Sequence, residues 1–371
     1  MGKPTRVGKP TRRTFAPGVA RAHAEEFGYM RIMLVAPPWL PVPPRAYGGT
    51  EAVIDELARG LVAAGHEVLL FATGESTCPV PRRSVYEWSQ GTQGSAEIER
   101  RHVVHAYEVA GDFDVVHDHT LLGPRYAARF PDVAVVTTNH GPFNAELAPV
   151  YRSIAERVAI IAISAAQARD ADGIPIAAVI HHGVDPRRFP FRAHAGDYVL
   201  FLGRMSPAKG PHRAARAARA AGQRLVIAAK MHEPEERRYF EECVRPLLDE
   251  DVVYVGEVGG DDKLNLLAGA RALVNPITWS EPFGLVMIEA LACGTPVLAF
   301  PNGAAPEIVS HGSTGFLCSD ELDMAMRLRQ VTELDRGACR ASVETWFSSE
   351  RMVAAHLELY ETIVSRQRLA A

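Results

Sequence analysis

Short apolar runs alternate with amphipathic segments from Met30 onward. The run "RIMLVAPPW" (31–39) predicts a strand, and "TEAVIDELARGLVAAG" (50–65) predicts a helix with its apolar face on Val53, Ile54, Leu57 and Leu61. A helix is expected over 96–110, and further strands in "EVLLFATG", "DVVHDHT", "VAVVTTNHG", "AIIAIS" and "AAVIHHGVD". Short apolar strands separated by helices are typical of a parallel sheet covered on both faces.

The alternation stops at "DPRRFPFRAHAGD" (185–197), which is rich in proline and charge, and then starts again. Strands are predicted in "DYVLFLGRM", "RLVIAAK", "VVYVGEV", "ARALVNPI" and "PVLAF", and helices in "PHRAARAARAAG" and over 233–249. We therefore expect an α/β protein with two Rossmann-like doubly wound domains, 30–190 and 191–349. Ligands bind outside the carboxyl ends of strands in such sheets, so two facing domains would form a ligand cleft.

Composition excludes several classes of protein. The 371 residues are 47% hydrophobic and 23% charged with a net charge of −4, which does not suggest a nucleic-acid partner. No apolar stretch approaches the ~20 residues that a membrane helix needs, so we expect no integral membrane segment. Five scattered cysteines without a Cys-x-x-Cys pair indicate a reducing, cytoplasmic location. Residues 1–29 are basic and predict a disordered tail, with Met30 as an alternative start.

Two strand ends carry groups suited to phosphate. Gly48 and Gly49 directly precede a predicted helix, whose amides and dipole suit an anion, although the Gly-Gly pair taken alone favours a tight loop without a ligand. In "FLGRMSPAKG", Arg204 and Lys209 flank a turn and are suited to hold a diphosphate; a solvated loop is the alternative. No G-x-G-x-x-G follows any predicted strand, which disfavours a nicotinamide or flavin dehydrogenase.

The stretch "TWSEPFGLVMIEALACGTPV" (278–297) places two carboxylates around a turn. Glu281 precedes the turn, and Glu289 lies inside a helix expected from Gly284 to about Cys293. The amides of Phe283, Gly284 and Leu285 would point into the cleft. Sugar or ribose hydroxyls could donate to both carboxylates, and such neutral partners require no counter-ion. An exposed helix position is the alternative for Glu289.

The segment "EPFGLVMIE" resembles the Glu-x₇-Glu motif of retaining GT-B glycosyltransferases of family 4. Eight other segments of the chain also occur in the order usual for that family: "YGGTE", "GHEV", "DVVHDH", "NHGPF", "HHGVD", "GRMSPAKG", "VGEV" and "GTPVLAF". The resemblance implies a GT-B fold that moves a sugar from a nucleotide-diphosphate sugar to a hydroxyl of a small-molecule or oligosaccharide acceptor. It also implies retention of configuration, no metal or other cofactor, and a C-terminal helix (350–371) that crosses back to the first domain.

Carried over by position, the resemblance assigns roles to these residues. Glu289 would bind the ribose, and Glu281 would face the hydroxyls of the donor sugar. Arg204 and Lys209 would bind the diphosphate, together with the amides of Gly284 and Leu285, while Gly49 would close on it from the first domain.

Three further positions follow from the same resemblance. His140, in "NHGPF", would hydrogen-bond the donor sugar near its anomeric centre, and Val258 would contact the base through its backbone. The chain departs from the family at "HHGVD", where Pro-Asn-Gly-Val-Asp is usual, and at "AAKMHEP", where many members have a glycine-rich turn. Lys230 is therefore either an extra phosphate or sugar contact or a residue that fills the loop.

Other interpretations remain open. A nucleotide-sugar epimerase of GT-B shape, a polysaccharide phosphorylase or synthase, and a non-catalytic sugar-nucleotide-binding protein share parts of this pattern. Asp112–Asp114 is similar to a metal-binding Asp-x-Asp motif, but it precedes a strand and predicts a structural turn. His117 and His119 share a strand face; without a third metal ligand, we expect them to line the cleft. The chain is also similar to enzymes of secondary metabolism, in particular to those of avilamycin-type antibiotic pathways.

Overall fold

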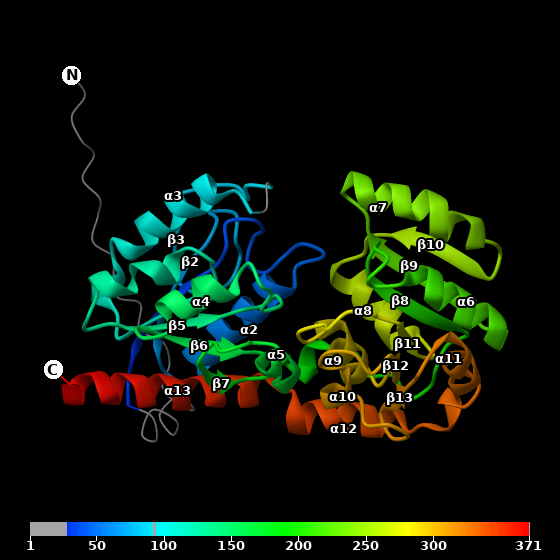
Figure 1. Cartoon of the computed structure of the whole chain (residues 1–371). Helices are drawn as coiled ribbons and strands as arrows, with labels where there is room; N and C mark the ends of the chain where they lie inside the picture. Colours follow the sequence, from blue (N-terminus) through cyan, green and yellow to red (C-terminus); the bar gives the residue numbers. More distant parts are fainter. Residues whose placement is uncertain (1–27, 92–93, 371) are drawn as a thin grey trace.

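The computed structural model describes residues 28–91 and 94–370 and contains two parallel sheets (Figure 1). The first sheet has seven strands in the order β3-β2-β1-β4-β5-β6-β7. Their bounds are β1 (Arg31–Val35), β2 (Glu67–Phe71), β3 (Arg82–Arg83), β4 (Val115–Asp118), β5 (Ala134–Thr138), β6 (Val158–Ala162) and β7 (Ile176–Val179). The chain thus runs outward from β1 in both directions, as doubly wound sheets do.

The second sheet has six strands in the order β10-β9-β8-β11-β12-β13. Their bounds are β8 (Tyr198–Arg204), β9 (Arg224–Lys230), β10 (Val252–Gly256), β11 (Leu273–Asn275), β12 (Val297–Ala299) and β13 (Gly315–Leu317). All strand pairs in both sheets are parallel. The prediction of two parallel α/β sheets is confirmed.

Helices cover both faces of each sheet, as Figure 1 shows. In the first half of the chain they are α2 (Gly49–Ala63), α3 (Ala96–Tyr107), α4 (Ala148–Ile154) and α5 (Ala165–Arg169). In the second half they are α6 (Pro211–Ala221), α7 (Pro234–Tyr239), α8 (Gly260–Gly269), α9 (Leu285–Ala292), α10 (Ala305–Ile308), α11 (Glu321–Leu328), α12 (Arg336–Trp346) and α13 (Ser349–Ala370). Within the described ranges, none is long and apolar enough to cross a membrane.

The alternation of side chains along β1 shows how the sheet acquires two cores. Ile32 and Leu34 pack with α2, whereas Met33 and Val35 pack with α3 and α4 on the opposite face. This is the two-residue period of a strand that is buried on both sides. The C-terminal helix α13 joins the first of these cores through Met352, Val353, Leu357, Tyr360 and Val364. Figure 1 shows α13 (red) running beneath the first sheet, as the resemblance implies.

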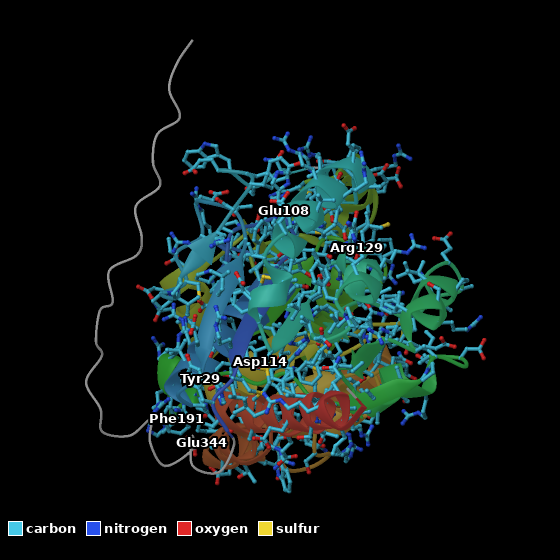
Figure 2. The ribbon with its side chains drawn as sticks, turned by 90° about the vertical axis from the view of Figure 1, so that its left-hand side faces the viewer. Tyr29, Glu108, Asp114, Arg129, Phe191 and Glu344 are labelled. Carbon is cyan, nitrogen blue, oxygen red and sulfur yellow. The ribbon has the colours of Figure 1, made fainter. Side chains whose placement is uncertain are left out.

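Three local features differ from, or refine, the sequence-based expectations. The helix expected over 233–249 ends at Tyr239 and continues as a π turn (Phe240–Val244) and a 3-10 turn (Arg245–Leu247), because Pro246 cannot continue an α-helix. Asp114 accepts a hydrogen bond from the Arg31 amide at 2.8 Å and lies 3.5 Å from Arg368 of α13, which agrees with a structural turn. Figure 2 shows Asp114 and Tyr29 on the side of the molecule that is on the left in Figure 1. Most of the predicted tail lies outside the described residues.

Candidate active site

Arg204 and Lys230 are the last residues of β8 and β9, and they are partners in the register of these two strands. Side chains of paired residues in parallel strands lie on the same face of the sheet, so the two cations share one corner of its carboxyl edge. The Arg204 side chain is 47% exposed, and its Nε lies 3.7 Å from Glu236 Oε1. Strand pairing thus gives Lys230 a place beside the predicted diphosphate ligand Arg204.

Lys209 and Glu281 form a close ion pair between two loops of the second half. Lys209 Nζ donates to Glu281 Oε2 at 2.6 Å, with only 17% and 14% of the side chains exposed. Gly303 holds the Glu281 backbone: its φ is +56°, and a Cβ there would lie 2.2 Å from the Glu281 carbonyl oxygen. Because no larger residue fits this approach, glycine at position 303 allows the backbone of the Glu281 turn to pack this closely.

Helix α9 begins and ends where the sequence predicts. Gly284 is its N-cap in the left-handed region (φ +91°), and Gly294 follows Cys293 with φ +80°. The first amides of α9 have no partner within the helix, so Leu285 and its neighbours present N–H groups at this end. Glu289 lies in the second turn of α9 and is 8% exposed.

Both predicted carboxylates are paired with lysines, which differs from the expectation that sugar hydroxyls alone would satisfy them. Glu289 Oε1 accepts from Lys263 Nζ of α8 at 2.6 Å, as Glu281 does from Lys209. A carboxylate this far from water requires a donor at all times, and a lysine supplies one without a ligand. The expected solvent-exposed alternative for Glu289 is wrong.

The loop before α2 reaches from the first sheet to the second. The Tyr47 amide donates to Glu257 Oε1 at 3.2 Å, and Lys230 Nζ lies 5.7 Å from the centre of the Tyr47 ring. Gly48 is the N-cap of α2, and a Cβ at Gly49, the first residue of α2, would lie 3.2 Å from Leu285 Cδ1. The glycine loop therefore contacts both the Lys230 corner and the start of α9, which the sequence could only place in separate domains.

His140 lies in a row of hydrogen-bonded imidazoles. Its Nε2 shares a hydrogen bond with His119 Nδ1 (2.9 Å), and its Nδ1 shares one with His182 Nε2 (3.3 Å). Burial lowers the pKa of His140 to about 3, and it also lowers the pKa values of His119 and His182, so the row is uncharged at neutral pH. Since both nitrogens of His140 are engaged, contact with a donor sugar requires that one of these bonds be exchanged.

His117 does not line the site, contrary to the expectation. It is fully buried, and its two ring nitrogens hydrogen-bond the Tyr360 hydroxyl of α13 (2.6 Å) and Thr138 Oγ1 (2.8 Å). Its position next to His119 on the strand suggested a common environment, but α13 covers His117. This contact could not be read from the strand pattern, because Tyr360 lies 243 residues further along the chain.

The side chains of two further predicted residues, Phe283 and Val258, are packed against the core of the second half. Phe283 is 2% exposed, and its ring packs against His181 (5.7 Å between ring centres) and His182 (5.1 Å). Val258 is half-buried in the loop after β10 and packs against the core of the second half. Their roles as amide or base contacts stay predictions.

Two family models match adjacent parts of the chain. The model described as Glycosyltransferase Family 4 matches residues 47–188, and the model described as Glycosyl transferases group 1 matches residues 187–337. The chain is a group 1 glycosyltransferase.

Curated and solved relatives of this glycosyltransferase span nearly its whole length. It is 28% identical to a glycogen synthase of Mycobacterium tuberculosis (strain H37Rv), covering 82% of this chain and 86% of the relative. It is 28% identical to a phosphatidyl-myo-inositol mannosyltransferase of Mycolicibacterium smegmatis, covering 90% and 94%. The crystal structure of AviGT4, a glycosyltransferase involved in avilamycin A biosynthesis, superposes with a TM-score of 0.73 at 28% identity, covering 91% and 98%. Anabaena HepE in complex with UDP-glucose shares the fold, with a TM-score of 0.71 at 20% identity, covering 91% and 100%.

The glycosyltransferase has site residues that sequence reasoning did not select. Lys263 pairs with Glu289, and the only available signal was that the chain has five lysines in all. Trp279 lies beside Lys209, with its ring centre 5.7 Å from Nζ and its buried indole N–H unpaired among the described residues. Glu51 is buried on α2; burial raises its pKa to about 7, against the opposing effect of Lys230. Its place two residues after the Gly-Gly pair, in the first turn of α2, was the signal that could have found it.

Proposed function

We propose that this glycosyltransferase moves a sugar from a nucleotide-diphosphate sugar to a hydroxyl group of an acceptor, with retention of configuration. The observation that supports this most is the arrangement around the Lys209–Glu281 pair. A lysine and a carboxylate lie together on loops at the carboxyl side of the second sheet, whose edge also carries Arg204 and Lys230. Cations suit a diphosphate, and a fixed carboxylate suits the hydroxyls of the sugar attached to it.

In the proposed reaction, the bond between the anomeric carbon and the phosphate oxygen breaks. The acceptor oxygen forms its bond to the same carbon on the same face. The proton of the acceptor hydroxyl passes to the leaving phosphate oxygen, so atoms and charge balance without an added base. Arg204 and Lys209 stabilise the charge that develops on the diphosphate, together with the amides at the start of α9.

Retention by this route requires no covalent sugar–enzyme intermediate. A double displacement would need a free carboxylate against the sugar. Glu281 is hydrogen-bonded to Lys209 instead, which favours a role in binding sugar hydroxyls over a role as nucleophile. The proposal also includes no metal ion, because two side-chain cations and a helix N-terminus serve the diphosphate.

The ribose of the nucleotide is assigned to Glu289, and the base to the backbone at Val258. The UDP-glucose in the HepE structure makes uridine the first base to test. The similarity to AviGT4 supports an acceptor from secondary metabolism, specifically an oligosaccharide antibiotic, and we propose a cytoplasmic location.

A thermal-shift screen against UDP, GDP, ADP and dTDP, followed by their sugar conjugates, tests the donor site. A selective rise with one nucleotide is expected in the native chain, an absent rise in Arg204→Ala, and an unchanged rise in Arg216→Ala, an exposed arginine of α6. Binding at one hundred times Kd adds about 2.7 kcal/mol, which is readily measured. NMR of the anomeric proton then separates retention from inversion, and it separates transfer from epimerisation of the donor. A chain that shifts with none of these nucleotides contradicts the proposal.

A further inference from the structure

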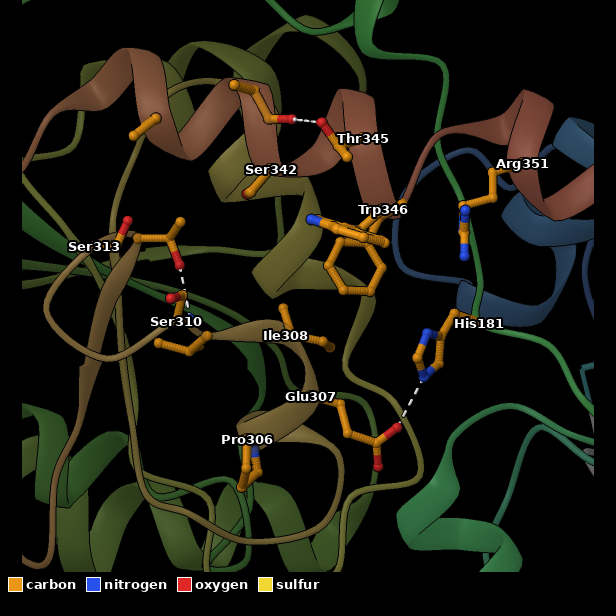
Figure 3. Close-up of a pocket in the computed structure, with 15 residues that line it drawn as sticks. His181, Pro306, Glu307, Ile308, Ser310, Ser313, Ser342, Thr345, Trp346 and Arg351 are labelled. Atoms are coloured by element: carbon orange, nitrogen blue, oxygen red, sulfur yellow. Dashed lines mark hydrogen bonds and ion pairs between the residues drawn. The ribbon is translucent and has the colours of Figure 1, made fainter.

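A cavity of about 690 Å³ lies in the second half of the molecule, beside the two segments that connect the halves (Figure 3). Its walls come from α10 and the stretch that follows it, from α12, and from the junction between α12 and α13, with His181 at one side. None of the residues predicted to bind the donor lines it. Its volume falls in the range of small-molecule sites, about 300–1,000 Å³.

The cavity exists because one face of α12 carries only small side chains. Ala338, Ala341, Ser342 and Thr345 follow the spacing of a single helix face and all line the cavity. No large side chain from α12 fills the space, and Trp346 stands at its edge with 57% of its surface exposed. An indole of this exposure is an available platform for the apolar face of a ligand.

The polar groups around Trp346 are mostly neutral or already paired. Ser342 Oγ donates to the Cys339 carbonyl oxygen (2.7 Å) and Thr345 Oγ1 to that of Ala341 (2.8 Å), so both hydroxyl oxygens remain available as acceptors. Glu307 Oε2 and His181 Nε2 lie 2.8 Å apart and satisfy each other. This leaves the cavity with hydroxyl acceptors next to an aromatic surface.

Arg351 is the cation of the cavity. Its guanidinium lies 5.3 Å from the centre of the Trp346 ring, and within the described ranges it forms no ion pair. Figure 3 shows Arg351 and His181 on the same side of the indole. Since His181 is engaged with Glu307, a phosphate would meet a single free cation beside a carboxylate, which is a poor anion site. A lipid chain would leave the polar groups unpaired.

We propose that this cavity is a second carbohydrate-binding site, in which one face of a sugar ring stacks on the Trp346 indole. The sugar hydroxyls donate to the oxygens of Ser342 and Thr345 and accept from Arg351. The choice of a saccharide as ligand rests on the proposed function, because an enzyme of oligosaccharide synthesis handles a chain longer than its catalytic site. The cavity holds a mono- or disaccharide unit of that chain.

The proposed saccharide site is separate from the donor site, but one of its lining residues contacts a residue next to the donor site. The His181 ring contacts Phe283, two residues after Glu281, and Glu307 accepts hydrogen bonds from the Ala165 and Ala166 amides of α5 (2.9 and 2.7 Å). A saccharide in the cavity therefore touches groups that connect the two halves of the molecule. The saccharide does not contact the Lys209–Glu281 pair, so a nucleotide at the donor site does not compete with the saccharide.

Isothermal titration of the full chain with maltose, cellobiose and a mannobiose tests the inference. We expect at least one of the three to bind, with an affinity about tenfold lower in Trp346→Ala, the effect of losing one aromatic stacking contact. Ala341→Leu, which fills the cavity without disturbing a helix, weakens binding similarly. Trp88→Ala, at an equally exposed tryptophan (62%) of the other half, leaves binding unchanged.

The outcomes separate the two proposals. Three results would overturn the second site. They are saccharide binding that is unchanged in Trp346→Ala and Ala341→Leu, displacement of the saccharide by UDP, and the absence of binding for all three sugars. The nucleotide thermal shift in the same variants reports on the donor site alone. If no saccharide binds but the nucleotide still raises the Tm, only this inference is refuted. If a saccharide binds but no nucleotide raises the Tm, only the proposed function is refuted.

Discussion

Replacing Lys263 by methionine removes the partner of a buried carboxylate while keeping most of the side-chain volume. Glu289 would remain in α9 with 10% of its side chain exposed and without its 2.6 Å hydrogen bond. Arg245→Met is the matched control, because Arg245 and Glu241 form an ion pair of the same 2.6 Å length with side chains that are 65% and 54% exposed. The two variants differ in the burial of the carboxylate that each leaves unpaired.

The expected magnitude follows from that burial. Breaking a fully buried pair by removing one partner costs about 3–5 kcal/mol, and exposed pairs contribute about 0–1 kcal/mol. Lys263 is 26% exposed, so water can partly replace its ammonium group. We therefore expect Lys263→Met to lower the free energy of unfolding by about 2 kcal/mol, between these two limits. For a domain of this size that is roughly 4–8 °C in Tm.

Differential scanning calorimetry of the native chain and both variants, with and without UDP, measures this. The rise in Tm on adding UDP should be larger for Lys263→Met than for the native chain, because the ribose hydroxyls then donate to the unpaired Glu289. A Tm loss no larger than that of Arg245→Met would refute the argument from burial. Equal UDP increments in the native chain and Lys263→Met would refute the assignment of Glu289 to the ribose.

Further outcomes are expected from the same structure. Arg204→Ala and Glu289→Ala should abolish transfer without unfolding the chain, and circular dichroism with an activity assay would expose turnover that persists. Transfer should survive EDTA; a loss that Mg²⁺ reverses would contradict the metal-free proposal. Gly303→Ala should cost more stability than Gly312→Ala, in which only left-handed strain (φ +80°) of about 1–2 kcal/mol acts, and equal urea midpoints would contradict the contact with Glu281. Burial lowers the pKa of His140 to about 3, so as the pH falls this histidine takes up a proton in the unfolded chain before it does so in the folded chain. The free energy of unfolding should therefore decrease below pH 6.5, by up to about 1.4 kcal/mol per pH unit for each histidine buried in this way. A free energy of unfolding in urea that stays constant from pH 7 to 5 would contradict this.

Local features of the chain were readable from the sequence because they depend on nearby residues. The continuous apolar run of β1, in a series of strands separated by helices, predicted a sheet covered on both faces, and the two cores confirm it. The glycines at 284 and 294 predicted the ends of α9, because each position needs a left-handed backbone that other residues adopt at a cost. The prediction of one helix over 233–249 is wrong, because the apolar periodicity continues across Pro246 whereas the α-helix does not.

Contacts between side chains of the site could not be predicted in this way. Arg204 and Lys230 are neighbours because β8 and β9 pair in a particular register. Glu289 and Lys263 lie 26 residues apart, and His140 meets partners 21 and 42 residues away. No pattern in the sequence states which of the five lysines reaches which carboxylate.

The sequence by itself determined the two sheets, the strand ends that carry polar residues, and the turn between Glu281 and Glu289, because backbone propensity and apolar periodicity act over a few residues. Only the tertiary structure decided that both carboxylates are paired with lysines, that His140 has no free nitrogen, and that an uncovered face of α12 leaves a cavity beside Trp346. These depend on strand order, register and helix packing, which bring together side chains that are distant in the chain.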